Sequence, residues 1–142
     1  MNFPKLHSKE NLQQYLNDFF LQEIINLGCK AVLSEMSESG IDWYTITYNG
    51  YELGNLRFKH TWANECWIEC SLTRDINLHT ISHYLGDKCI GTDSYMASSK
   101  ERNEYYNSKC NKNTINHIRK LVLSYKTIKN QMKKQQIAEM FK

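Results

Sequence analysis

Apolar residues recur at three- and four-residue steps near the amino terminus, which is the spacing of one face of an α-helix. Ser8 is a favourable N-cap residue for such a helix, and Gly28 stands where a left-handed residue commonly ends one. The apolar positions between them are Leu12, Tyr15, Leu16, Phe19, Phe20, Ile24 and Leu27. The pattern predicts one amphipathic helix between Ser8 and Gly28.

After residue 28 the apolar positions alternate with polar ones, as in strands that bury one face. We expect strands near 30–36, 42–49, 51–61 and 65–72. Asn49-Gly50 predicts a two-residue hairpin turn, because both residues accept the positive φ of a type I′ turn. This turn would place Ile46 opposite Leu53. The apolar side chains then change face before Leu56, so we expect a β-bulge at Gly54-Asn55.

A second hairpin is expected to turn through Ala63-Asn64. It would pair Phe58 with Ile68 in the core and Arg57 with Glu69 outside, and both pairs are favourable across antiparallel strands. The segment from 30 to 72 therefore predicts an antiparallel meander of three or four strands.

Downstream of the meander the sequence predicts helices. Asp75 or Asn77 is expected to cap a short helix that reaches Leu85, with Gly86 at its end and a loop over residues 86–97. Ser98-Ser99-Lys100-Glu101 has the spacing of a capping box, which predicts a further helix to about residue 109.

The last helix is expected to begin at Asn113 or Thr114. Its apolar stripe is Ile115, Ile118, Val122, Tyr125, Ile128 and Met132, and Lys112, Arg119, Lys126 and Lys133 run beside it at intervals of seven. The fold class expected is α+β: an N-terminal helix, a three- to four-stranded antiparallel meander sheet, then a short helix and a long basic C-terminal helix.

Length and composition are those of one domain over residues 1–142, because 41% of the residues are hydrophobic and 23% charged. No apolar run has the length of a signal peptide or a membrane span, so we expect a cytoplasmic protein without a membrane partner. The five cysteines are odd in number and irregularly spaced, which favours free thiols.

Charge is the most informative property of the sequence. The net charge is only +3, but residues 109–142 carry nine basic side chains and one acid, a net of +8. Residues 1–108 carry nine basic side chains and fourteen acids, a net of −5. Helices whose basic face is only solvated usually mix Lys with Glu. The asymmetry indicates an acidic partner, either a phosphate backbone or an acidic protein surface. The helix could also dock on the acidic body of its own chain through its apolar stripe, which is compatible with either partner.

Two groups of residues could support metal or catalytic chemistry. Cys66, Cys70, His79 and His83 have a spacing that could hold zinc if the histidines shared one helix face. Buried thiols and surface histidines explain the same spacing, and we favour them. Cys89 with His83 and Asp87 could form a nucleophilic site, but nearness in sequence is weak support for it. We therefore expect neither a metal nor another cofactor, and an enzyme only as an alternative.

Trp43, Trp62 and Trp67 all fall in the predicted sheet. If Trp43 and Trp67 faced outward beside Arg57 and Lys59, they could form a stacking or protein-binding surface. A helix covering that face is the expectation we favour.

The function expected is that of a non-enzymatic binding protein. The partner would be nucleic acid, or an acidic surface of a nucleic-acid-processing protein. The residues expected to bind it are Arg119, Lys120, Lys126, Lys129, Lys133 and Lys134. Many Asn, Lys and Tyr residues suggest an AT-rich genome, so a phage or mobile-element accessory protein, such as an inhibitor of a host complex, fits. The alternatives are an immunity-type protein that neutralises an enzyme, and a small Cys/His or zinc-dependent enzyme.

Overall fold

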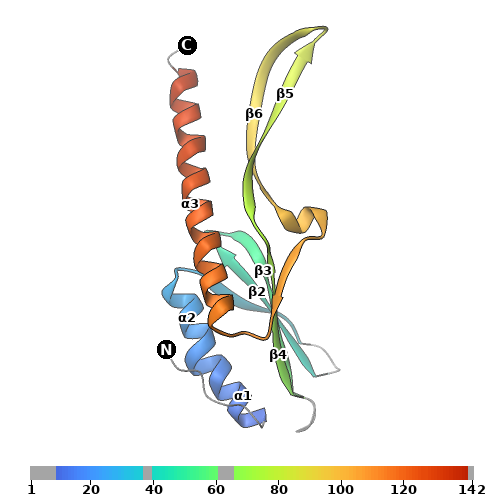
Figure 1. The fold of residues 1–142 in the computed structure, drawn as a ribbon, viewed down its shortest axis with the longest axis vertical. Helices are drawn as coiled ribbons and strands as arrows, with labels where there is room; N and C mark the ends of the chain where they lie inside the picture. The colour runs from blue at the N-terminus through green and yellow to red at the C-terminus, as the bar shows by residue number, and fades with distance from the viewer. Residues whose placement is uncertain (1–8, 37–39, 61–65, 141–142) are drawn as a thin grey trace.

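A computed structural model of the protein describes residues 9–36, 40–60 and 66–140 (Figure 1). In these ranges helices lie on one face of a five-stranded antiparallel sheet, and a separate two-stranded hairpin projects away from it. The α+β class is thus confirmed. The expected three- to four-stranded meander followed by a short helix is wrong in detail, because the sheet has a fifth strand and the short helix is absent from the described residues.

The N-terminal helix is confirmed and consists of α1 (Lys9–Tyr15), a π-helical turn (Leu16–Phe20) and α2 (Leu21–Asn26). The amide of Leu21 donates to the carbonyl of Leu16, five residues back rather than four. This turn therefore holds one more residue than an α-helical turn. Gly28 ends the helix with φ 86°, and the Cys29 amide donates to the Ile24 carbonyl at 3.2 Å. This is the left-handed helix end that the sequence predicts.

Four of the sheet strands match the predicted ones: β1 (Lys30–Met36), β2 (Ile41–Tyr48), β3 (Tyr51–Lys59) and β4 (Trp67–Thr73). The fifth, β7 (Tyr105–Ser108), pairs with β4, so the sheet order is β1-β2-β3-β4-β7. The predicted tight turn is confirmed, because Asn49 and Gly50 have φ 50° and 78°. The predicted turn at Ala63-Asn64 and Trp62 lie outside the described residues.

The register between β3 and β4 is the predicted one, with Phe58 opposite Ile68 and Arg57 opposite Glu69. The bulge on β3 lies one residue earlier than expected. Thr47 opposes Glu52 and Ile46 opposes Gly54, so the pairing of Ile46 with Leu53 is wrong and Leu53 is the extra residue.

Close packing explains why residue 54, directly after the bulge, is a glycine. A Cβ at residue 54 would lie 2.1 Å from the Ser71 carbonyl oxygen on β4, so only glycine fits there. The backbones of β3 and β4 can therefore approach this closely only because residue 54 has no side chain.

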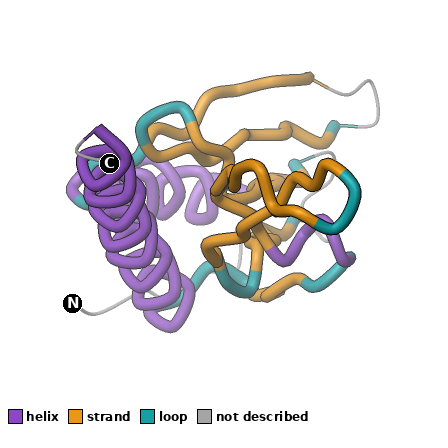
Figure 2. Tube along the Cα trace, turned by 90° about the horizontal axis from the view of Figure 1, so that it is seen from above, coloured by secondary structure: helices purple, strands orange, loops and turns teal. Residues whose placement is uncertain are grey.

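The short helix and the loop predicted for residues 75–97 are wrong, because this segment is a long hairpin of β5 (Ile76–Leu85) and β6 (Lys88–Ser98). We call this hairpin the arm. Gly86, at the turn, has φ 61°. Figures 1 and 2 show the arm leaving the sheet and running beside the C-terminal helix.

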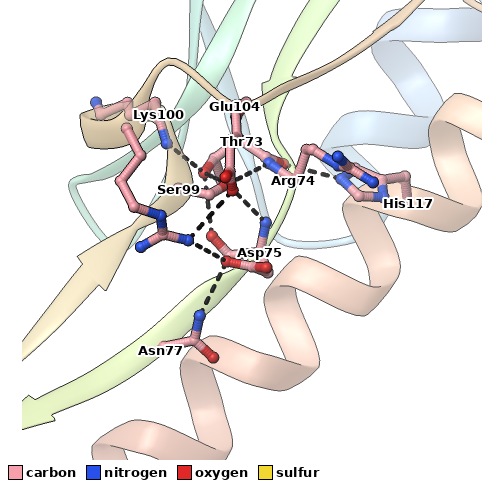
Figure 3. A network of polar contacts seen from close by, with 9 residues as sticks. Thr73, Arg74, Asp75, Asn77, Ser99, Lys100, Glu104 and His117 are labelled. Atoms are coloured by element: carbon pink, nitrogen blue, oxygen red, sulfur yellow. Dashed lines mark hydrogen bonds and ion pairs between the residues drawn. The ribbon is translucent and has the colours of Figure 1, made fainter.

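A polar network fixes the base of the arm (Figure 3). The Ser99 hydroxyl oxygen accepts hydrogen bonds from the amides of Arg74 at 2.8 Å and Asp75 at 3.0 Å, where β4 passes into β5. It also lies 2.9 Å from the Thr73 hydroxyl. From the C-terminal helix, the His117 imidazole donates a hydrogen bond to the Thr73 carbonyl at 2.9 Å.

The helix predicted from Ser98 to about residue 109 is therefore wrong. A 3-10 turn (η2, Ser99–Arg102) ends at Asn103, which has φ 59°, and β7 follows. Ser98 makes no cap hydrogen bond, and Ser99 bonds to the base of the arm instead.

The long C-terminal helix is confirmed as α3 (Lys112–Met140). Asn111 caps it, because its side-chain oxygen accepts from the amides of Asn113 at 3.0 Å and Thr114 at 3.3 Å. None of the helices within the described ranges contains a stretch long and apolar enough to cross a bilayer.

One core joins the N-terminal helix, the inner face of the sheet and α3 as far as Ile128. Its fully buried members include Phe20, Ile24, Ile46, Leu53, Leu56, Cys70, Leu72, Ile118 and Leu121. The last turns of α3, after Met132, extend beyond this core beside the arm (Figure 1).

Candidate anion-binding groove

Three lysines of α3 meet the β2–β3 turn in an open groove of about 490 Å³. We call it the cationic groove. Its lining residues are Asn49, Tyr125, Lys126, Lys129, Asn130 and Lys133. The turn supplies Asn49 and α3 supplies the others, so the groove forms where the helix leaves the sheet.

Tyr125 forms the floor of the groove. Its ring packs edge-on against Tyr48 with the centroids 5.1 Å apart, and it lies 5.8 Å from the ring of Tyr51. The Lys129 ammonium lies 5.7 Å from the centroid of the Tyr125 ring, which is the range of a cation–π contact. The aromatic cluster thus anchors α3 to the sheet and holds one lysine over the groove.

The structure brings together only some of the six predicted binding residues. At about 100° per residue, Lys126, Lys133 and Arg119 fall on one line along α3, and Lys129 lies next to it. Arg119 is on the same flank but does not line the groove, and its guanidinium donates to the Asn116 side-chain oxygen at 2.8 Å.

Lys120 and Lys134 lie elsewhere on the helix. They are about 80–120° around α3 from Lys126, so they face away from the groove. All six predicted residues are exposed, as the sequence interpretation requires.

The groove contains lysines but no carboxylate among its lining residues. The ion pairs found in the described ranges lie elsewhere, such as Arg57 with Glu69 at 3.5 Å, and Lys100 with Glu52. None of them includes a lysine of α3. The positive charge of the groove is therefore not matched by an acid within the part of the chain that the structure describes.

Three of the groove residues were not predicted from the sequence. Asn49 was identified only as a turn residue, Tyr125 only as part of the apolar stripe, and Asn130 not at all. The spacing of Tyr125 and Lys129, four residues apart on one helix, is the signal that could have paired them.

The proposed zinc ligands do not converge. Cys70 is fully buried in the core, whereas His79 and His83 are exposed on the arm. The premise that the two histidines share a helix face is wrong, since they lie on β5, where four residues span about 13 Å. No cluster of three or more His, Cys, Asp or Glu residues that could hold a metal occurs among residues 9–36, 40–60 and 66–140.

The proposed Cys89, His83 and Asp87 site is also not assembled. His83 opposes Gly91 in the hairpin, and its ring lies 2.7 Å from the Asp93 carboxylate rather than from Asp87. Cys89 opposes Tyr84, the neighbour of His83, and neighbouring residues in a strand face opposite sides. The thiol and the imidazole therefore lie on opposite faces of the arm.

The buried thiols pack as core side chains. Burial raises the pKa of the Cys29 thiol to about 11. Burial, and then the hydrogen bond with Cys70, raise the pKa of Cys110 well above its usual value. Both thiols therefore stay protonated at neutral pH and lack the thiolate that nucleophilic chemistry needs.

The outer face of the sheet carries Trp43 and Arg57, whose guanidinium carbon lies 5.4 Å from the Trp43 ring. The Arg57 guanidinium also donates to the Ser71 hydroxyl at 2.9 Å. These side chains are partly exposed, and the described helices pack on the opposite face. The helix that we expected over this face is not found in the described ranges.

No protein-family model, no curated protein and no solved structure matches the chain.

Proposed function

We propose that this protein is a non-enzymatic binding protein that engages the phosphate backbone of nucleic acid through the cationic groove. The observation that carries the proposal is the convergence of Lys126, Lys129 and Lys133 in one groove without a carboxylate. Lysine ammonium groups bind phosphates as point charges and release condensed counterions when they do so.

The geometry favours a backbone contact over base recognition. Lys126 and Lys133 are about 10 Å apart along the helix axis, and DNA carries a phosphate charge every few ångströms, so both can meet one duplex or strand. The amides of Asn49 and Asn130 add neutral donors at the rim. Tyr125 is only 7% exposed, so it supports the lysines and leaves little ring surface for a base.

An accessory protein of a phage or mobile element remains our proposal for the biological setting. An acidic surface of a nucleic-acid-processing protein has the same charge as a phosphate backbone, and it is the second candidate partner. Salt dependence and nuclease treatment separate the two.

The test measures binding of the full chain to fluorescein-labelled single- and double-stranded oligonucleotides by anisotropy over a salt series. The test variant is Lys126→Glu/Lys133→Glu. The matched control is Lys120→Glu/Lys134→Glu, which makes the same charge change on the flank that faces away from the groove.

We expect the test variant to bind about 50-fold more weakly near 0.1 M salt, because two phosphate contacts are lost, and its salt slope to fall by about two. The control should lose much less affinity and keep its slope. Thermal unfolding should be similar for both variants, since all four lysines are exposed.

Affinity that does not change with salt, or an equal loss in both variants, would contradict binding in the groove. Capture from a lysate then distinguishes the second candidate. A partner protein retained after nuclease treatment and lost in Lys126→Glu/Lys133→Glu would identify an acidic protein surface as the target.

A further inference from the structure

Four strands in the described ranges have an edge without a neighbouring strand: β1 and β7 in the five-stranded sheet, and β5 and β6 in the arm. An open edge presents unpaired backbone N–H and C=O groups that can pair with another chain. Proteins protect such edges with charged side chains, bulges or very short strands. The four edge strands differ in how many of these protective features they contain.

Three of the edges are protected. β1 begins with Lys30 and is bulged at Ser34, where its register with β2 shifts. β7 is only four residues long. β6 contains Lys88 and Asp93, is bulged at Ile90, and shares a groove with α3 through Thr92–Ser94.

β5 has none of these protections. It is ten residues long and contains no Lys, Arg, Asp, Glu, Pro or Gly. Only its first residues pack against α3, through Ile76 and Leu78. From His79 to Leu85 every residue is exposed, including Ile81 at 48% and Leu85 at 74%.

The arm also lacks a core of its own in this outer half. A two-stranded hairpin is marginally stable in water unless further strands or a helix pack on it. Two further strands would therefore stabilise the arm, and they would also pair the free backbone N–H and C=O groups on the open edge of β5.

We propose that β5 pairs antiparallel with β5 of a second copy of this chain, which joins two arms into one four-stranded sheet in the order β6-β5-β5-β6. Most soluble oligomers form around such a two-fold axis, where one surface meets its own copy. The proposal is independent of the cationic groove, because no groove residue lies on the arm.

Charge argues for a second copy as the occupant. A pairing centred on Ile81 sets Ile81 against itself, His79 against His83 and Leu78 against Tyr84, so no like charges of Lys, Arg, Asp or Glu face each other. The equivalent pairing of β6, centred on its middle residue Asp93, would oppose two carboxylates.

The test measures the mass of the full chain by light scattering after gel filtration and by sedimentation over a wide range of protein concentration. We expect a dimer of twice the chain mass. Ile81→Lys should raise its dissociation constant by at least about tenfold, because two ammonium groups would then face each other across the axis.

Ile90→Lys is the matched control. It makes the same substitution at an exposed isoleucine of the arm, on the strand that lies away from the axis. It should dimerise as the unaltered chain does, and circular dichroism should show both variants folded. A monomer at every concentration, or equal weakening by both substitutions, would overturn the proposal.

Cross-linking tests the register. Ile81→Cys in a Cys89→Ser background should form a disulfide-linked dimer under oxidised glutathione, since directly opposed Cβ atoms in antiparallel strands approach disulfide distance. Ile90→Cys in the same background should not. Failure of the Ile81→Cys chain to cross-link would overturn the pairing centred on Ile81.

Discussion

The five-stranded sheet and the arm are both antiparallel ladders, but they are stabilised by different parts of the molecule. In the sheet, the inner face of each central strand is buried under helices, as with Leu56 and Cys70. In the arm, all residues from His79 to Asp93 are exposed, and the described contacts concentrate at its base and along α3. The two ladders thus share the same backbone pairing, but only the sheet gains stability from buried side chains along its length.

The largest expected effect compares two glycines, one in each ladder. Gly54→Ala in β3 would place a Cβ 2.1 Å from the Ser71 carbonyl oxygen, so the β3 and β4 backbones must separate. We expect a loss of about 3 kcal/mol or more in the free energy of unfolding. Gly91→Ala in β6 meets no atom within 4 Å and should change it by less than about 0.5 kcal/mol.

Urea denaturation followed by circular dichroism measures both variants. A tolerated Gly54→Ala would show that the sheet can open at β3 and β4 without loss of the core, and would remove the contrast with the arm.

A smaller effect is expected at the junction between the two ladders. Ser99→Ala removes the acceptor for the Arg74 and Asp75 amides, in a position where Ser99 itself is fully buried. We expect a loss of about 2 kcal/mol, because two backbone donors lose their acceptor at a partly buried position. Ser82→Ala, on the exposed part of β5, is the control and should have almost no effect.

Hydrogen exchange adds a local readout for Ser99→Ala. Protection of amides in the arm should fall more than protection in β2 and β3, since the base of the arm is loosened and the sheet core is untouched. Equal loss in both ladders would mean that the junction stabilises the whole domain rather than the arm.

The smallest expected effect is a pH dependence of the body that contains the sheet. Burial raises the pKa of Cys29 from 9.0 to about 11. The stabilisation by the neutral thiol is therefore complete below pH 9 and is lost as the pH rises from 9 to 11. Between pH 8 and pH 10 we expect a loss of about 1 kcal/mol from this thiol.

The measurement is the free energy of unfolding of the unaltered chain and of Cys29→Ala at both pH values. The variant should lose about 1 kcal/mol less stability than the unaltered chain over this interval, whatever its stability at pH 8. Parallel pH profiles would contradict the assigned burial of Cys29.

The sheet was predictable from sequence and the arm was not, for a physical reason. Alternation of apolar and polar residues arises when one strand face is buried, as in β3 and β4. The outer half of the arm buries neither face, so its sequence was not selected for that alternation. Leu78, Ile81 and Leu85 instead have helix-like spacing. The one local signal was Gly86-Asp87, a dipeptide common in two-residue hairpin turns.

The capping box at residues 98–101 failed for a related reason. A serine hydroxyl can satisfy a helix end or another part of the backbone equally well. Ser99 bonds to amides 24 and 25 residues away, and nothing in the local sequence specifies that partner.

The candidate site was predictable in its charge but not in its shape. The stripe beside Lys126 and Lys133 indicated an exposed cationic flank, and α3 presents it. The sequence could not separate these lysines from Lys120 and Lys134, because only the position of the β2–β3 turn makes one flank of the helix a groove. Asn49 comes from a strand pair far from α3 in sequence.

The turn at Asn49 has a consequence for sequence variation among any relatives of this chain. Aspartate suits the first central position of a type I′ turn as well as asparagine does, so folding would accept either residue there. A carboxylate at that position, however, would stand at the rim of a groove lined by three lysines. Position 49 is thus a place where evolution can alter ligand affinity while leaving the architecture unchanged.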